Sequence, residues 1–166
     1  MPDKSTTERA KEDLREGKSP STAAGEFVHE EIEHVREGKH GARSPEQAIA
    51  IGLSKARRAR IPLKPPIKGK TKDSTRKSAE RVYEKGQSND AEEPSPRVSC
   101  AREKVLEREP RSTASHRSLS AQSRTASRQR SKGERHAAAM KAVQTKGKAG
   151  LQKAGQKAAR TRAKSH

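Results

Sequence analysis

The residues of this chain best suited to chemistry are three histidines and two glutamates in one short stretch. His29, His34 and His40 carry ring nitrogens that can ligate a metal ion, and Glu30 and Glu33 carry carboxylate oxygens. A helix usually holds zinc through two ligands four residues apart on one face. His29 and His34 are five residues apart, about 140° around a helix, and His40 lies beyond a predicted helix end. We therefore expect no metal ligands here.

Other catalytic signals are also missing from the sequence. Cys100 is the only cysteine, so an intramolecular disulfide is impossible, and no basic helix N-terminus or fixed partner is predicted beside it to activate its thiol. Gly147 and Gly150 interrupt a lysine tract and do not form a phosphate-binding loop. We expect a protein that is not an enzyme, with no catalytic residues, no cofactor and no small-molecule substrate.

The charge of the chain is concentrated in its second part. There are 39 Lys and Arg against 21 Asp and Glu, a net charge of +18, of which +15 falls in residues 97–166. Such an excess predicts a polyanionic partner, and we expect nucleic acid, DNA rather than RNA, held through its phosphates. The expected phosphate contacts are the basic residues near position 57 and those of the tail: Lys55, Arg57, Arg58, Arg124, Arg128, Arg130, Lys132, Lys141, Lys146, Lys148, Lys153, Lys157, Arg160, Arg162 and Lys164.

The elements that must position these residues have few apolar side chains to pack. Only 18 of the 166 residues are Leu, Ile, Val or Phe, against a threshold of about 20% below which a highly charged chain is typically disordered. Ordering costs about 1 to 2 kcal/mol of backbone entropy per residue. We expect an all-α protein, with a small two- to three-helix N-terminal unit and a largely disordered, cationic tail. The tail is partly helix-prone because Ala and Lys favour helices.

A repeated motif marks where the helices of this unit begin and end. LREGKSP at 14–20 and VREGKHGARSP at 35–45 each contain a glycine followed by a Ser-Pro pair. Gly17 and Gly38 suit the left-handed position after a helix C-terminus. Each Ser-Pro pair then places an N-cap hydroxyl before a proline at the first helical position. In the second copy, Ser44 and the glutamine three residues later predict a capping box.

The helix predicted between these two motifs is amphipathic, with one exception. Winding residues 21–37 at about 100° per residue places Glu31 on an otherwise apolar arc, made of Ala24, Phe27, Val28, Ile32 and Val35. Another face carries four glutamates that we expect either to be solvated or to attract the basic tail weakly: Glu26, Glu30, Glu33 and Glu37. We expect this helix to close on the next one, where Ile51 lies on the basic side and is poorly explained.

A family resemblance is carried by the run HGARSPEQAIAIGLSKARRA, preceded by STAAGEFVHEEIEHVREGK and followed by a Lys/Ala-rich tail. Over roughly residues 5–86 the chain resembles small basic bacterial proteins built on an uncharacterised domain, some of which are loosely labelled plasmid stabilisation protein. The resemblance implies a bacterial setting, a non-enzymatic role and association with DNA. Arg60 stands where the family leads us to expect glycine. The tail is similar to linker-histone-like tails in composition only.

The predicted organisation follows from these signals. No apolar stretch reaches the roughly 18 residues of a membrane span, so we expect no membrane partner and a cytoplasmic, nucleoid-associated location. The predicted segments are a helical unit at 1–60 (helices at about 6–16, 21–37 and 45–58), a Pro-rich linker at 61–71, a short helix at 72–86 and a low-complexity basic tail at 87–166.

Three functional hypotheses are compatible with this organisation. The first is a sequence-independent nucleic-acid-binding or architectural protein that acts through phosphate contacts of the tail. The second is an interaction adaptor, in which the helical unit docks a partner protein, with a possible link to plasmid stabilisation, and the tail adds non-specific attraction. The third is a stress-associated disordered protein whose charge serves solubility.

Overall fold

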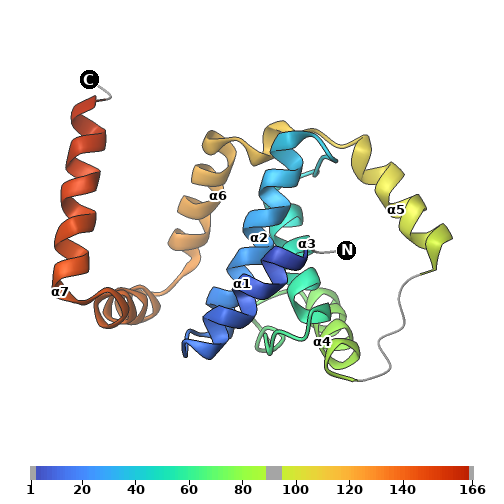
Figure 1. Cartoon of the computed structure of the whole chain (residues 1–166), viewed down its shortest axis with the longest axis horizontal. Helices are drawn as coiled ribbons and strands as arrows, with labels where there is room; N and C mark the ends of the chain where they lie inside the picture. Colours follow the sequence, from blue (N-terminus) through green and yellow to red (C-terminus); the bar gives the residue numbers. More distant parts are fainter. Residues whose placement is uncertain (1–2, 89–94, 165–166) are drawn as a thin grey trace. The chain divides into compact units, whose positions relative to one another are not determined.

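The computed structural model describes residues 3–88 and 95–164, and within these ranges it contains helices and no strand (Figure 1). The side chains of Thr145 and Lys164 lie outside this description. The predicted all-α class is confirmed. The helices, including one 3-10 helix called η1, are α1 Lys4–Arg15, α2 Pro20–Glu37, α3 Pro45–Arg58, α4 Asp73–Gln87, α5 Pro96–Glu107, η1 Ser112–Ala114, α6 His116–Gln129 and α7 Lys132–Lys164.

The prediction of a largely disordered tail is wrong, because α5, η1, α6 and α7 occupy most of residues 96–164. N-capping hydrogen bonds mark the start of two of these helices. At α7, Ser131 Oγ accepts a hydrogen bond from Glu134 N (3.2 Å) and Glu134 Oε2 accepts one from Ser131 N (2.8 Å), which is a complete capping box. At α6, Ser115 Oγ accepts from Ser118 N. The small number of apolar residues limits how much of the tail can be buried. It does not prevent helix formation, because the hydrogen bonds within a helix depend on the helix propensity of local residues.

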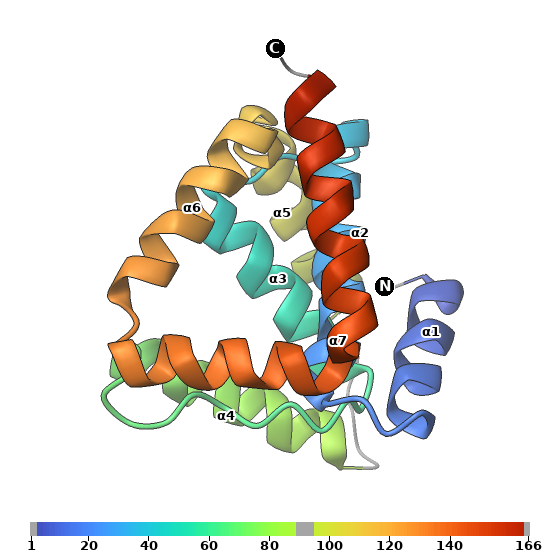
Figure 2. The same cartoon turned by 90° about the vertical axis from the view of Figure 1, so that its left-hand side faces the viewer.

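The chain divides into two compact units, residues 1–122 and 123–166, and each is described by itself. The second unit contains the end of α6 and all of α7, and none of its described side chains is buried. Figure 2 shows α7 as two helical pieces that meet at a bend. The bend is at Gly147, whose φ of 63° and ψ of 174° are not helical. Glycine tolerates this conformation because it has no β-carbon.

The first unit is centred on α2, which packs against both α1 and α3, while α4 packs against α3. The core between these helices consists mainly of small side chains, with two larger ones: Ala10, Ala23, Ala24, Phe27, Ala56 and Ile61. Small residues let the helices approach closely. A β-carbon on Gly52 of α3 would lie only 2.7 Å from the Cα of Val28 in α2, so this contact requires glycine.

A second core joins α2 and α3 to the segment that follows α5. Val35, Ala42, Ala48 and Ala114 are buried together, so η1 closes this end of the unit. Backbone hydrogen bonds fix the contact: Gly41 N donates to the carbonyl of Leu106 (2.8 Å), and Ala42 N donates to that of Pro110 (3.2 Å). The Arg36 guanidinium also donates to the Ala114 carbonyl at 3.0 Å. Residues 106–114, which the sequence places in the tail, are therefore part of the first unit.

Most predicted helix ends are found, but the Ser19 hydroxyl does not cap α2 and contacts the hydroxyls of Ser21 and Thr22 instead. Gly17 and Gly38 both adopt left-handed backbone, with φ of 76° and 80°. Ser44 caps α3 and accepts a hydrogen bond from Gln47 N at 3.3 Å. The Gln47 side chain accepts from Arg43 N at 2.7 Å rather than from Ser44 N, so the predicted capping box is displaced by one residue.

Ile51, which the sequence leaves on the basic side of α3, faces α5. Together with Val98, Ala101, Val105 and Leu106 of α5 it lines an apolar groove of about 520 Å³. Val98 and Val105 remain exposed in this groove. The position of Ile51 is thereby explained by a helix that the sequence does not predict.

Candidate functional site

Two of the three cations that we expected to bind phosphate near residue 57 are sequestered inside the first unit. The Arg57 side chain is buried and donates hydrogen bonds to the carbonyls of Leu63 (3.2 Å) and Leu53 (3.5 Å). Lys55 is turned into a cluster of carboxylates on α2. Arg58 is exposed. Of these three, only Arg58 lies where a phosphate could reach it.

The predicted phosphate contacts of the tail are exposed wherever their side chains are described. They are Arg124, Arg128, Arg130, Lys132, Lys141, Lys146, Lys148, Lys153, Lys157, Arg160 and Arg162. The Lys164 side chain lies outside the described residues. Residues 123–166 carry 13 Lys and Arg against a single acid, Glu134. The second unit is therefore an exposed and almost purely cationic surface.

The second piece of α7 arranges part of this charge as a stripe. Lys153, Lys157 and Arg160 fall within about 60° of one another around the helix and span about 10 Å along its axis. Over a similar distance, one strand of duplex DNA carries about three phosphates, at 3.4 Å each along the helix axis. The spacing of the stripe therefore suits contact with successive phosphates of one strand.

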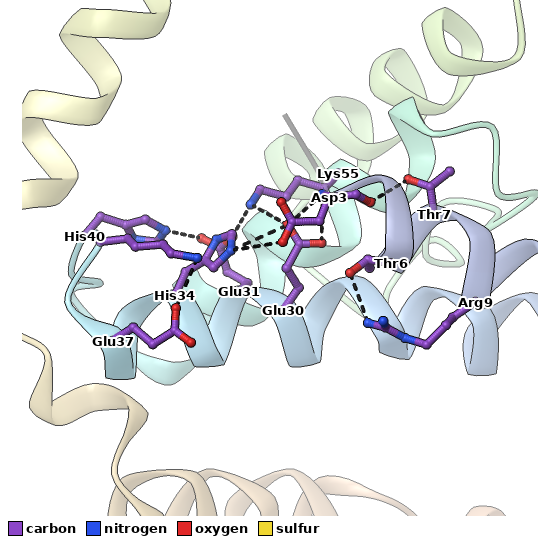
Figure 3. A network of polar contacts seen from close by, with 11 residues as sticks. Asp3, Thr6, Thr7, Arg9, Glu30, Glu31, His34, Glu37, His40 and Lys55 are labelled. Atoms are coloured by element: carbon purple, nitrogen blue, oxygen red, sulfur yellow. Dashed lines mark hydrogen bonds and ion pairs between the residues drawn. The ribbon is translucent and has the colours of Figure 1, made fainter.

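A separate polar cluster lies inside the first unit, between α2, α3 and the loop that follows α2 (Figure 3). Its centre is Glu31, whose side chain is 0% exposed. Glu31 Oε2 lies 2.6 Å from Lys55 Nζ, and Glu31 Oε1 lies 3.3 Å from His40 Nε2. Among the described residues, neither carboxylate oxygen accepts a hydrogen bond of acceptable geometry. These contacts are ion pairs by distance only, so the carboxylate is incompletely satisfied.

His34 connects Glu31 to two further carboxylates. Its Nε2 lies 3.9 Å from Glu30 Oε1 and 3.9 Å from Asp3 Oδ2. Glu30 is almost fully buried and accepts hydrogen bonds from Asp3 N, at 3.3 and 3.4 Å for its two oxygens. Burial lowers the pKa of His34, and the ammonium groups of Lys55 and Lys39 lower it further. The imidazole is therefore neutral near pH 7, with one ring nitrogen free to act as a ligand.

The second histidine of the cluster comes from the loop. The rings of His34 and His40 meet edge-on with centroids 6.1 Å apart. His40 Nδ1 lies 3.0 Å from its acceptor, the carbonyl oxygen of Gly41. Because a carbonyl only accepts hydrogen bonds, this contact places a proton on Nδ1 and leaves Nε2 facing Glu31.

Sequence reasoning missed this cluster for a specific reason. His29 is exposed and His34 is half-buried, and among the described residues His29 contributes no ligand atom to this cluster. We set His40 aside because it lies beyond the helix end at Gly38. In the structure, the loop after α2 turns back and places His40 beside Glu31. One signal was present in the sequence, since Glu31 lies on the apolar arc of α2. A carboxylate on a buried face requires a cationic partner.

The four glutamates predicted as one solvated or tail-binding face are occupied within the first unit. Three of them form ion pairs, Glu26 with Arg9 (2.8 Å), Glu33 with Arg36 (2.7 Å) and Glu37 with Lys39 (3.1 Å). The fourth, Glu30, is buried in the cluster.

The described helices include none that is long and apolar enough to span a membrane. The sequence matches no family model, no curated protein and no solved structure among those with which it was compared.

Proposed function

We propose that the protein binds nucleic acid without sequence preference, through phosphate contacts of α7 and the end of α6. The observation that carries the proposal is the second unit itself, which has a net charge of +12 and no buried side chain among its described residues. Cationic side chains on such a surface can contact a polyanion and replace its counterions.

Duplex DNA is the preferred partner in this proposal. The chain has one Phe, one Tyr and no Trp, so it lacks the aromatic platforms on which single strands stack. The hypothesis of a disordered stress protein is not carried forward, because helices extend through residues 96–164.

The test is the salt dependence of binding to a random-sequence duplex, measured by fluorescence anisotropy. If about eight phosphates are neutralised, log affinity should fall with log salt at a slope near −7. A slope shallower than about −2 contradicts the proposal. Duplexes of unrelated sequence should bind equally, and a matched RNA duplex shows whether DNA is preferred.

A matched pair of charge variants localises the contact. Lys153→Gln, Lys157→Gln and Arg160→Gln together should weaken binding and reduce the salt slope by about 2 to 3. The control removes three exposed lysines of the first unit, Lys4, Lys11 and Lys77, and should leave the slope unchanged. Equal losses in both variants indicate only an effect of net charge. Full affinity in a chain that ends at residue 122 contradicts binding through α7 and the end of α6.

A further inference from the structure

We propose that Glu31, His34 and His40 form a binding site for a divalent transition-metal ion of the zinc class. Each of these residues offers one ligand atom, and the three atoms lie within 4.8 Å of one another. Two imidazole nitrogens and one carboxylate oxygen are a ligand set that zinc uses in proteins, with a fourth position left to water.

The distances suit an ion of this size after a small adjustment. Bonds of about 2.0 to 2.2 Å in a tetrahedron separate neighbouring ligand atoms by roughly 3.3 to 3.6 Å. Glu31 Oε1 and His40 Nε2 already lie 3.3 Å apart. His34 reaches the site from one helical turn further along α2, so a small side-chain rotation brings its nitrogen within bonding range.

The contacts of the His40 ring also suit a ligand role. Its Nδ1 lies 3.0 Å from the carbonyl oxygen of Gly41, and its Nε2 faces Glu31 Oε1 at 3.3 Å. The hydrogen bond to this carbonyl is the outer-shell contact that usually orients a metal-binding histidine.

The local charge balance also favours a bound cation. Asp3, Glu30 and Glu31 bring three carboxylates, and the ammonium of Lys55 is the cation that contacts Glu30 and Glu31. Lys39, which also faces His34, pairs with Glu37. Glu31 is fully buried and incompletely hydrogen-bonded. The cluster therefore contains more carboxylates than ammonium groups, and two of these carboxylates, Glu30 and Glu31, are shielded from water.

A neighbouring set of side chains, Asp3, Glu30 and His34, also places its ligand atoms within 4.8 Å. It shares His34 with the proposed site but has a single histidine, and its Asp3 side chain is 61% exposed. This set lines an open cavity of about 180 Å³ that reaches His34 from the surface. We assign it the role of an entrance, through which an ion reaches the more buried ligands.

The first test is calorimetric titration of the full chain with Zn²⁺, in a Cys100→Ser background because the exposed thiol of Cys100 also binds zinc. One ion should bind per chain, and Mg²⁺ should not compete because it prefers oxygen ligands. His34→Gln with His40→Gln should weaken binding by at least about 100-fold. The control, His116→Gln with His136→Gln, changes two exposed histidines and should bind as the parent does. Equal affinity in the two variants overturns the proposal.

The second test needs no substitution in the cluster and remains valid if the double variant fails to fold. Diethyl pyrocarbonate modifies accessible histidines, and mass spectrometry of peptides reports each one. Zn²⁺ should slow modification of His34 and His40 and leave His116 and His136 unchanged. A proton on His40 Nε2 is the competing occupant of the gap beside Glu31. Modification rates that do not respond to Zn²⁺ favour the proton and contradict a metal site.

Discussion

At the scale of single residues, Arg60 adopts a backbone conformation that side chains with a β-carbon usually avoid. It lies two residues after the end of α3 with a φ of 65°, and its N–H donates to the carbonyl of Arg57. This left-handed conformation costs roughly 1 to 2 kcal/mol for a residue other than glycine. Glycine adopts this conformation without that cost, because it has no β-carbon.

Replacing Arg60 by glycine should therefore stabilise the protein. The relief of strain exceeds the larger entropy that glycine gives the unfolded chain, about 0.5 to 1 kcal/mol. We expect Arg60→Gly to raise the free energy of unfolding by about 0.5 to 1 kcal/mol, measured by urea denaturation. Arg60→Ala retains the β-carbon and serves as the control. If both variants gain equally, the guanidinium rather than the backbone is responsible.

Lys55 shows what sequence periodicity leaves open for one residue. Its place opposite the apolar face of α3 is typical of a solvated cation, and we expected it to bind phosphate. In the structure its ammonium lies 2.6 Å from the buried carboxylate of Glu31. Periodicity identifies the faces of a helix, but it does not specify which second helix covers the polar one. The sequence shows that Glu31 lies on the apolar face of α2, but it does not show that Lys55 is the partner of this carboxylate.

At the scale of helices, the glycines of α2 and α3 have opposite roles. Beyond the adjacent residues and the backbone of its own helix, Gly25 of α2 has no heavy atom within 4 Å of the place where a β-carbon would stand. A β-carbon on Gly52 of α3 would lie 2.7 Å from Val28 Cα and 2.9 Å from the carbonyl oxygen of Phe27. These neighbours belong to the backbone of α2, so they cannot move aside without shifting the helix.

The same substitution at these two glycines should have opposite effects. Gly25→Ala should stabilise the protein by up to about 1 kcal/mol, because alanine favours the helix interior. Gly52→Ala should destabilise it by about 1 to 3 kcal/mol, because the methyl group forces α2 and α3 apart. Thermal unfolding followed by circular dichroism measures both. A stabilising Gly52→Ala would show that the two helices are not in close contact in solution.

Helix positions were largely predictable because capping acts over three or four residues. The Ser-Pro pairs precede α2 and α3 and Gly38 ends α2, whereas α3 ends at Arg58 without a glycine. Ser131 and Glu134 mark the start of α7 in the same local way. The docking of residues 106–114 was not predictable. It depends on backbone hydrogen bonds such as that from Gly41 N to the Leu106 carbonyl, which carry no side-chain signature. The return of His40 to Glu31 depends on the same loop.

At the scale of the whole molecule, the two units differ in how they are stabilised. The first has two buried clusters, and the second of them includes Ala114. The second unit has no buried side chain among its described residues. The end of the cooperative unit should therefore lie beyond residue 114 and before α7.

Truncation at two points tests where the cooperative unit ends. A chain ending at residue 122 should melt within a few degrees of the full chain, because it keeps both clusters. A chain ending at residue 96 loses Ala114 and the carbonyl acceptors of Gly41 and Ala42. It should lose about 1 to 3 kcal/mol of stability through unsatisfied backbone groups, seen as a lower midpoint in differential scanning calorimetry. Equal midpoints for the two truncated chains would show that residues 106–114 do not dock.

The predominance of alanine in the core has a consequence for how the protein tolerates variation. Ordinary cores are most sensitive to the removal of volume, since a truncated side chain leaves a void. Here most buried apolar positions are alanine, including Ala10, Ala23, Ala24 and Ala56, and have only one methyl group to lose. At these sites, stability should instead be most sensitive to substitutions that enlarge the side chain. In a saturation mutagenesis screen, alanine-to-glycine changes should survive far more often at these positions than alanine-to-valine or alanine-to-leucine changes, with Phe27, Ile61 and Val35 showing the reverse bias.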